Sequence, residues 1–433
     1  MPDSLHDEVR VLRLKPKILT RQEHNISREN ISDNALKVMY RLKNAGFDAY
    51  LVGGSVRDLL LGREPKDFDV VTNARPEQAR ELFRNSILIG RRFRLLHVRF
   101  GDEIIEVSTF RTAHHVADGE GHIVDGTIVR DNVYGTIDDD VWRRDLSVNA
   151  LFYNIRDFSV IDYVGGLDDI RAGRIRLIGD PEQRYVEDPV RLLRVIRFAT
   201  KLGFRIDPAT EAPIARYTSL LQKIPPARIF EEALKLFLGG YALQTFEQLR
   251  HYNLFAELFP QTEDILAEEE GGFPHMLLVN ALSNTDARLM EGKAVTPGFL
   301  IAALLWIPMQ AIYRENLSTG MDERDAMYFA SDVVISRQLA NTALPRRFTK
   351  MARDIWQFQL RLKKTKGKQP QKILEHPRFR AAYDFLLLRS QSGENVGDLA
   401  DWWTRYQAEH PQTQRKRKHT ESRPARRKRR KKT

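Results

Sequence analysis

The chain has 433 residues, 42% of them hydrophobic, which is enough for two or three folded domains. It contains no cysteine, and this excludes disulfides, cysteine-ligated zinc and a thiol nucleophile. No stretch approaches the roughly 20 apolar residues of a membrane-spanning helix, and the first 20 residues lack the apolar core of a signal peptide. We therefore expect a cytoplasmic protein.

The first half of the chain alternates helical and strand patterns after a polar leader. Residues 32–46 predict a helix that Ser32 caps and Gly46 ends. Residues 49–62 read as a short strand, a Gly-Gly-Ser turn and a helix, and residues 66–72 as a strand. Further strands are predicted from "SILIG", "RLLHVRF" and "EIIEVSTF", which are rich in β-branched and aromatic residues.

Residues 112–137 form a polar stretch with several glycines, which predicts a mobile loop. The histidines in it, His114, His115 and His122, could form a metal site, but scattered histidines in a loop explain them as well. After about residue 168 nearly all patterns are helical, as in "DPVRLLRVIRFATKLGF" and "FRAAYDFLLLRS". The pattern predicts an α+β head followed by an all-helical remainder.

The net charge of +11 lies entirely at the C-terminus. Residues 415–433 contain 12 Lys or Arg and one Glu, whereas the rest of the chain carries 57 residues of each sign. Such a run cannot bury apolar surface, so we expect it to be disordered. It suits a polyanion, because each neutralised phosphate releases counterions; a solubilising tail or a nuclear-address-like run is the alternative. The predicted parts are a leader (1–30), a head (31–168), a helical neck (169–260), a helical body (261–410) and a basic tail (411–433).

Two aspartates interrupt the predicted strand 66–72. Side chains alternate along a strand, so Asp67 and Asp69 share a face, about 7 Å apart along the chain. Paired carboxylates can hold divalent ions such as Mg²⁺, and two such ions activate a hydroxyl and steady a leaving pyrophosphate. An edge strand with solvated aspartates is the alternative. A third acid would complete the site, and the sequence leaves Glu106 and Asp145 as candidates.

Two further clusters suit a nucleotide. Gly53 and Gly54 would let backbone N–H groups approach a phosphate, and Arg57 could add a charged fork; an ordinary tight turn is the alternative. In "DVWRRD" (140–145) two arginines and two acids lie within six residues. Arg143 and Arg144 could bind a triphosphate, and Asp140 could accept from a ribose hydroxyl. The alternative is a set of surface salt bridges, each of which contributes little to stability.

A predicted helix in "EDPVRLLRVIRFA" (187–199) carries an arginine at every third position. Arg191, Arg194 and Arg197 therefore line one side of it. Asp188 precedes the helix, and an Asp and Arg pair can hydrogen-bond the edge of a base. The alternative is a solvated basic face.

Four motifs in this order resemble those of class II template-independent RNA nucleotidyltransferases, the family of bacterial poly(A) polymerases and CCA-adding tRNA nucleotidyltransferases. They are "LVGGSVRDLLLG…KDFDVVT", "EIIEVSTFR", "DVWRRDLSVNALFYN" and "EDPVRLLRVIRFA", and "IPPARIFEEALKL" extends the match. The resemblance implies a polymerase-β-like head with a mixed sheet, a helical neck and body, and Mg²⁺ or Mn²⁺ as the metal. It also implies ATP and RNA 3′ ends as substrates.

The resemblance also implies roles for individual residues. Asp67 and Asp69 match the metal-binding carboxylates, and Asp145 matches the acid of the third motif that is counted with the catalytic residues. Asp140 matches the position that senses the ribose 2′-hydroxyl. Asp188 and Arg191 match the pair that reads the base in the CCA-adding members, which leaves Arg194 and Arg197 as candidates for base or phosphate contacts.

Two segments favour the poly(A) polymerase branch. "LIGRRFRLLHV" (88–98) and "PPARIFEE" are similar to that branch, and the basic tail suits an enzyme that holds diverse RNA ends by charge. The only His-Asp dipeptide is His6-Asp7, so the HD-type phosphohydrolase domain of many CCA-adding enzymes is not indicated. We predict a polynucleotide adenylyltransferase; the alternatives are a CCA-adding enzyme and a non-catalytic RNA-binding protein on a degenerate transferase fold.

Overall fold

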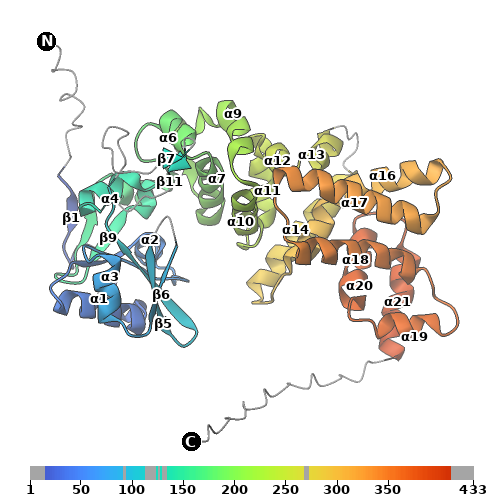
Figure 1. Ribbon diagram of the computed structural model, residues 1–433, viewed down its shortest axis with the longest axis horizontal. Helices are drawn as coiled ribbons and strands as arrows, with labels where there is room; N and C mark the ends of the chain where they lie inside the picture. Colours follow the sequence, from blue (N-terminus) through green and yellow to red (C-terminus); the bar gives the residue numbers. More distant parts are fainter. Residues whose placement is uncertain are drawn as a thin grey trace, which may run out of the picture. The chain divides into compact units, whose positions relative to one another are not determined.

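The computed structural model describes residues 15–90, 94–112, 123–124, 127–128, 134–267 and 273–410 (Figure 1). Most of the predicted loop 112–137, with its three histidines, lies outside these ranges, as do the start of the leader and the basic tail. The chain packs into two units. Met1–Pro260 forms the first together with Thr285–Lys293 and Leu339–Ala343, and the other residues from Gln261 onward form the second.

An eight-stranded mixed sheet, in the order β1-β10-β9-β2-β3-β6-β5-β4, forms the centre of the head. The mixed sheet confirms the predicted fold class: β3 and β6 run parallel and all other neighbours are antiparallel. The strands are β1 (Lys17–Leu19), β2 (Ala49–Val52), β3 (Asp69–Thr72), β4 (Ser86–Ile89), β5 (Leu95–Phe100), β6 (Glu103–Thr109), β9 (Leu151–Asn154) and β10 (Val160–Asp162). A separate hairpin pairs β7 (Ile123–Val124) with β8 (Thr127–Ile128).

Two elements differ from the sequence prediction. Lys17–Leu19, assigned to a polar leader, instead forms the edge strand β1, which pairs with β10. The strand expected over residues 66–72 begins only at Asp69, so Asp67 precedes it. Both differences arise because strand limits depend on the partner strand, which a local pattern does not contain.

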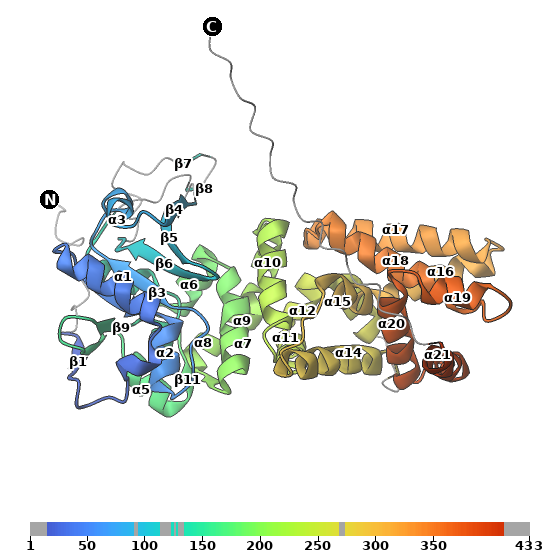
Figure 2. The ribbon, with the colours of Figure 1, turned by 90° about the horizontal axis from the view of Figure 1, so that it is seen from below.

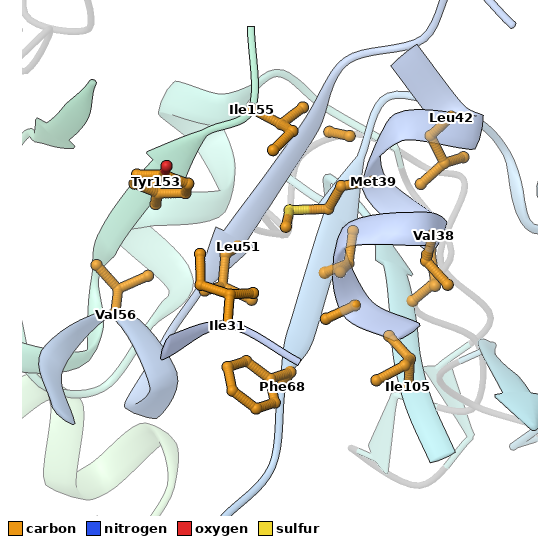
Figure 3. Close-up of a cluster of buried hydrophobic side chains, with 14 of the residues drawn as sticks. Ile31, Val38, Met39, Leu42, Leu51, Val56, Phe68, Ile105, Tyr153 and Ile155 are labelled. Carbon is orange, nitrogen blue, oxygen red and sulfur yellow. The ribbon is translucent and has the colours of Figure 1, made fainter. Parts of the chain in front are cut away.

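Helices cover both faces of the sheet. They are α1 (Asp33–Asn44), α2 (Gly54–Leu60), α3 (Pro76–Leu82), α4 (Ile137–Arg143) and α5 (Gly166–Ala172). Ser32 caps α1 as predicted, since its hydroxyl accepts from the backbone N–H groups of Asn34 and Ala35. Figure 3 shows one core, in which Val38 and Met39 of α1 pack toward Leu51 and Phe68.

The opposite face of the sheet has its own smaller core. Val71 of β3 lies in it together with Val52, Phe152 and Val141 of α4. Alternation along β3 therefore places Asp69 on the α4 side, whereas Val70 lies in the core under α1. One face of β3 stabilises the fold while the other presents an acidic side chain to the end of α4.

A buried aspartate closes the turn after β10. Asp162, 2% exposed, accepts the backbone N–H groups of Val164, Gly165 and Gly166 through Oδ1 and that of Leu167 through Oδ2. We expect Asp162→Asn to lower the free energy of unfolding by about 1–3 kcal/mol, because the amide nitrogen cannot accept the fourth bond. Urea denaturation checks this against Asp168→Asn, whose exposed carboxylate lies six positions on. Equal stability of the two variants would contradict it.

After the head, nearly all described elements are helical, as predicted. Helices α6–α12 continue the first unit: α6 (Pro181–Glu187), α7 (Val190–Leu202), α8 (Pro208–Glu211), α9 (Ile214–Tyr217), α10 (Pro226–Phe237), α11 (Ala242–His251) and α12 (Leu254–Leu258). The short strands β11 (Arg174–Ile175) and β12 (Arg205–Ile206) pair in parallel beside them. Helices α7 and α10 lie side by side (Figure 2), so residues 187–199 face residues 226–237 across one interface.

The later helices belong mostly to the second unit. They are α13 (Pro260–Ala267), α14 (Phe273–Met290), α15 (Pro297–Leu304), α16 (Trp306–Ser318), α17 (Glu323–Asn341), α18 (Arg346–Leu362), α19 (Gln369–Leu374), α20 (Phe379–Gln391) and α21 (Gly397–Glu409). Trp403 of α21 is fully buried against Phe379, and its ring nitrogen donates to the carbonyl of Leu362. Within the described ranges, no helix is long and apolar enough to cross a bilayer.

Candidate active site

Two carboxylates lie on neighbouring strands. Asp69 opens β3, and the parallel pairing of β3 with β6 sets it directly beside Glu106. Glu106 alternates with Ile105 and Val107, which point into the core under α1. It therefore shares with Asp69 the face toward α4. Asp67 stands exposed two residues before Asp69, so all three predicted metal-ligand candidates of this segment lie at one end of β3.

Burial and neighbouring carboxylates determine the electrostatics of Asp69. Asp69 keeps contact with solvent, but protein surrounds it on most sides. This partial removal from water, together with the negative charges of Glu106 and Asp67, raises the pKa of Asp69 to about 6, against a smaller opposite effect of Arg144. A divalent cation among these oxygens would remove the repulsion, so the donor set suits a hard metal ion.

The surroundings of Glu106 bear on the choice of the third acid. Its carboxylate lies 3.4 Å from Nε2 of His97, which stands opposite it on β5. Among the described residues, no three acidic or histidine side chains are already gathered at metal-binding distance.

The glycine turn brings backbone to the carboxylates. Gly53 has φ +76°, and a Cβ built on it would lie 3.9 Å from Nη1 of Arg144 and 4.0 Å from Oδ2 of Asp69. Gly53 thus lies between the acidic pair and the end of α4, with Gly54 as the first residue of α2. A larger residue at position 53 would adopt a strained backbone and occupy this space.

Arg57 does not face this space in the structure. The sequence suggested that its fork binds phosphate, but its side chain is 1% exposed and is occupied inside the protein. Nη1 donates to Oδ1 of Asn149 (2.5 Å), and Nε and Nη2 donate to Asp58. Arg57 therefore joins α2 to the segment before β9, and it supports the turn from within.

The "DVWRRD" segment lies on α4 and just after it. Arg144 donates from Nε and Nη2 to Oδ2 of Asp140, one helical turn earlier, and Asp140 is buried. Arg143 is the last residue of α4 and is partly exposed. Arg144 is thereby held beside Gly53 and Asp69, where a triphosphate would meet it.

Asp145 has a different environment from the other acids. Its Oδ2 accepts from Nε of Arg194 on α7 (2.5 Å), and Oδ1 accepts from the backbone N–H of Leu146. Burial alone would raise the pKa of Asp145, but the Arg194 guanidinium outweighs it and the pKa is lowered. Since the register of β3 and β6 sets Glu106 directly beside Asp69, whereas Asp145 is bonded to Arg194, the geometry favours Glu106 as the third acid.

The arginine row on α7 is not a solvated basic face. Arg191 is buried, and Arg194 and Arg197 are partly buried. The guanidinium groups of Arg57, Arg194 and Arg197 lie 5.3, 5.7 and 4.5 Å from the ring centre of Phe198. The row therefore lines the side of α7 that faces the head. This arrangement excludes the alternative that the three arginines form a solvated basic face.

The predicted base-reading pair is held by two other residues. Asp188 Oδ2 accepts from Nη2 of Arg228 on α10 (2.7 Å), and Arg191 Nη1 donates to Oε2 of Glu187 (2.6 Å). The two residues are joined through the backbone, since the N–H of Arg191 donates to the carbonyl of Asp188 (3.0 Å), whereas their side chains bond to other partners. Each side chain of the pair is thus held in place by a partner on a neighbouring turn or helix.

Sequence reasoning missed several residues that build this site. Asn149, Arg184, Glu187 and Arg228 carry polar contacts to predicted site residues, yet none was assigned a role. Glu187 and Arg228 lie inside the motifs "EDPVR" and "PPARIFEE", so their position was a signal. Asn149 lies inside the motif "DVWRRDLSVNALFYN", so its position was a signal as well. Arg184 lies in none of the motifs, and its partners Arg143 and Arg144 are 41 and 40 residues away.

Comparison with known families covers most of the chain. Residues 49–176 match the poly A polymerase head domain, and residues 203–266 match a probable RNA and SrmB-binding site of polymerase A. Residues 319–433 match the arginine-rich C-terminus of polymerase A.

Individual relatives agree with these matches. The chain is 49% identical over 422 residues to poly(A) polymerase I of Escherichia coli O157:H7, covering 94% of this chain and 89% of that protein. It is 40% identical over 215 residues to the CCA-adding enzyme of Lactobacillus helveticus, covering 49% of this chain and 52% of that protein. The solved structure of the Bacillus stearothermophilus CCA-adding enzyme in complex with CTP is similar at a TM-score of 0.55 and 26% identity, covering 87% of this chain and 82% of that one. The chain belongs to the poly(A) polymerase family of nucleotidyltransferases.

Proposed function

We propose that this chain is a template-independent adenylyltransferase that adds AMP from ATP to RNA 3′ ends and produces poly(A) tails. The observation that carries this is the convergence of Asp69, Glu106, Gly53 and Arg144 at the end of β3. Carboxylates beside a glycine turn and an arginine suit a metal-bound triphosphate.

The chain's own residues bind and orient the two substrates. Asp67, Asp69 and Glu106 would hold Mg²⁺ or Mn²⁺, which when bound promotes ionisation of the RNA 3′-hydroxyl and neutralises charge on the pyrophosphate. Arg144, fixed by Asp140, lies where it can bind the triphosphate. The 3′-oxygen forms a bond to the α-phosphorus, the bond from that phosphorus to the β-phosphate oxygen breaks, and pyrophosphate leaves.

The base is selected by hydrogen-bond polarity. Asp188 can accept from the amino group of adenine while Arg191 donates to the neighbouring ring nitrogen. Guanine and uracil present the opposite polarity at this edge, so each would leave a charged group unpaired. Cytosine offers the same polarity as adenine, which means that the pair alone does not exclude CTP.

RNA binding is the role we propose for the neck and the tail. Residues 203–266 match a model described as a probable RNA-binding site, and residues 415–433 carry 12 basic side chains. A product of poly(A) rather than CCA is supported by the extent of similarity: the poly(A) polymerase relative aligns over 94% of this chain, the CCA-adding relative over 49%.

A nucleotide-incorporation assay tests this function. Each labelled nucleotide is supplied separately with Mg²⁺ to a generic RNA and to a tRNA that lacks its 3′ CCA, and products are sized on a gel. We expect ATP to give long A tracts on both RNAs. Incorporation of CTP confined to the tRNA would assign the chain to the CCA-adding branch, and no incorporation with either Mg²⁺ or Mn²⁺ would indicate a non-catalytic RNA-binding protein.

A further inference from the structure

Arg184 on α6 joins two parts of the site that are distant in sequence. Its side chain is 12% exposed, and Nη2 donates to the backbone carbonyls of Arg143 (3.1 Å) and Arg144 (2.5 Å). Nη1 of the same guanidinium donates to Oε2 of Glu187 (2.7 Å). One planar fork thus contacts both the triphosphate segment at the end of α4 and the acid that precedes α7.

Glu187 and Arg184 together hold Arg191. Nη1 of Arg191 donates to the same Glu187 oxygen (2.6 Å) and to the backbone carbonyl of Arg184 (2.8 Å). Arg191 therefore takes its position from residues that are themselves tied to α4. The path from the triphosphate segment runs through Arg184 and Glu187 to Arg191. Each link is a hydrogen bond in which at least one partner is charged, and such bonds are stronger than those between neutral groups.

The arrangement around Arg184 costs more free energy than a purely structural contact between α6 and α4 would. Burial and the like charge of Arg191 both lower the pKa of Arg184, and its Nε has no hydrogen-bond partner among the described residues. Two arginines share one carboxylate oxygen of Glu187. An apolar side chain could join α6 to α4 at lower cost, whereas only a fork reaches two carbonyls and an acid at once.

We infer that Arg184 is a positioning residue that sets the distance between the base-reading Arg191 and the triphosphate segment at residues 143–144. The inference rests on the proposed function, because it assumes that Arg191 reads the base. A purine edge lies farther from the ribose than a pyrimidine edge does. A fixed distance between Arg191 and the triphosphate segment therefore favours ATP over CTP, which the Asp188 and Arg191 pair alone does not separate.

The test uses the full chain with Arg184→Gln and Arg184→Lys. We expect KM for ATP to rise about tenfold to a hundredfold in Arg184→Gln with a smaller fall in kcat, since misplacement of about 1 Å costs on this order. The preference for ATP over CTP, as a ratio of kcat/KM values, is expected to fall about tenfold. Incorporation of GTP and UTP should stay excluded, because Asp188 and Arg191 retain their polarity. Arg184→Lys should resemble Arg184→Gln, because an ammonium group lacks the fork.

Arg216→Gln is the matched control. Arg216 lies exposed on α9 and pairs with Glu182 of α6, the helix that carries Arg184, so this variant should keep the wild-type KM and nucleotide preference. Thermal unfolding verifies that each variant is folded. If Arg184→Gln does not fold, the kinetic test is made with Arg184→Lys. A folded Arg184 variant with unchanged KM and unchanged preference would overturn the inference.

A second pair of variants separates this inference from the proposed function. Asp188→Asn and Arg191→Gln are expected to admit GTP or UTP, because they alter the polarity of the reading edge. If these variants leave nucleotide choice unchanged, the base-reading function itself is wrong. If they change it and the Arg184 variants do not, only the positioning role of Arg184 is wrong.

Discussion

The double substitution Asp67→Asn and Asp69→Asn is expected to lower kcat for ATP incorporation by about 10³-fold or more. Asparagine keeps the size of each side chain but removes the two negative charges that would bind the metal, and loss of such electrostatic stabilisation has effects of this order. RNA binding should be unchanged, since the proposed RNA contacts lie elsewhere. Single-turnover incorporation and filter binding of the same RNA measure the two effects, and retained incorporation would refute the metal assignment.

Because the pKa of Asp69 is raised, we expect the single substitution Asp69→Asn to change the stability of the fold as well. A carboxyl whose pKa is higher in the folded than in the unfolded state destabilises the fold when it is ionised. Without metal, this cost begins above the ordinary pKa of 3.8 and is complete above about 6. Asp69→Asn should therefore raise Tm at pH 7.5 without Mg²⁺, and the gain should vanish as the pH approaches 4. Asp48→Asn, at an acid paired with exposed Arg156, is the control.

The second large effect is expected from Asp145, the largely buried partner of Arg194, whose side chain is 13% exposed. Asp145→Asn should lower the free energy of unfolding by about 2–4 kcal/mol, because it leaves the Arg194 guanidinium without its counter-charge. Incorporation of ATP should also fall, since this ion pair joins the segment after α4 to α7. Urea denaturation, with hydrogen–deuterium exchange over residues 140–200, measures the loss and locates it.

A double-mutant cycle and a pH series test this reading of Asp145. Arg194→Gln alone should cost a similar amount, and the double variant should cost less than the two single changes together. The pKa of Asp145 is lowered on folding, so its contribution is present above the ordinary pKa of 3.8 and is lost as the pH falls below it. Strict additivity, or a difference from wild type that varies between pH 5 and 8, would contradict the proposed pair.

The choice of the third acid shows the limit of local patterns. From the sequence, Glu106 and Asp145 were equivalent, because each lies in a motif rich in charge and apolar residues. The parallel pairing of β3 with β6 places Glu106 beside Asp69, and the packing of α7 places Arg194 on Asp145. Both facts are contacts between residues more than 35 positions apart, which no window of the sequence contains.

Arg57 and Arg184 also show that local sequence does not determine where a side chain lies. Arg57 follows the glycine turn, so its sequence position indicated a phosphate ligand, yet it is buried against Asn149. Arg184 lies in a helix with no motif of its own, yet it contacts residues 143, 144 and 187. An arginine side chain is long enough to serve elements on either side, and packing selects between them.

The sequence by itself determined the mixed-sheet head, the helical remainder and the identity of the acids at β3. These follow from periodicity, glycine turns and alternation along a strand, all of which act over a few residues. Only the tertiary structure decided which carboxylate stands beside Asp69, which arginines face the head and which residues hold the base-reading pair. Strand register and helix packing bring distant charges within hydrogen-bond distance, and their energies depend on burial and neighbours that exist only once the chain has folded.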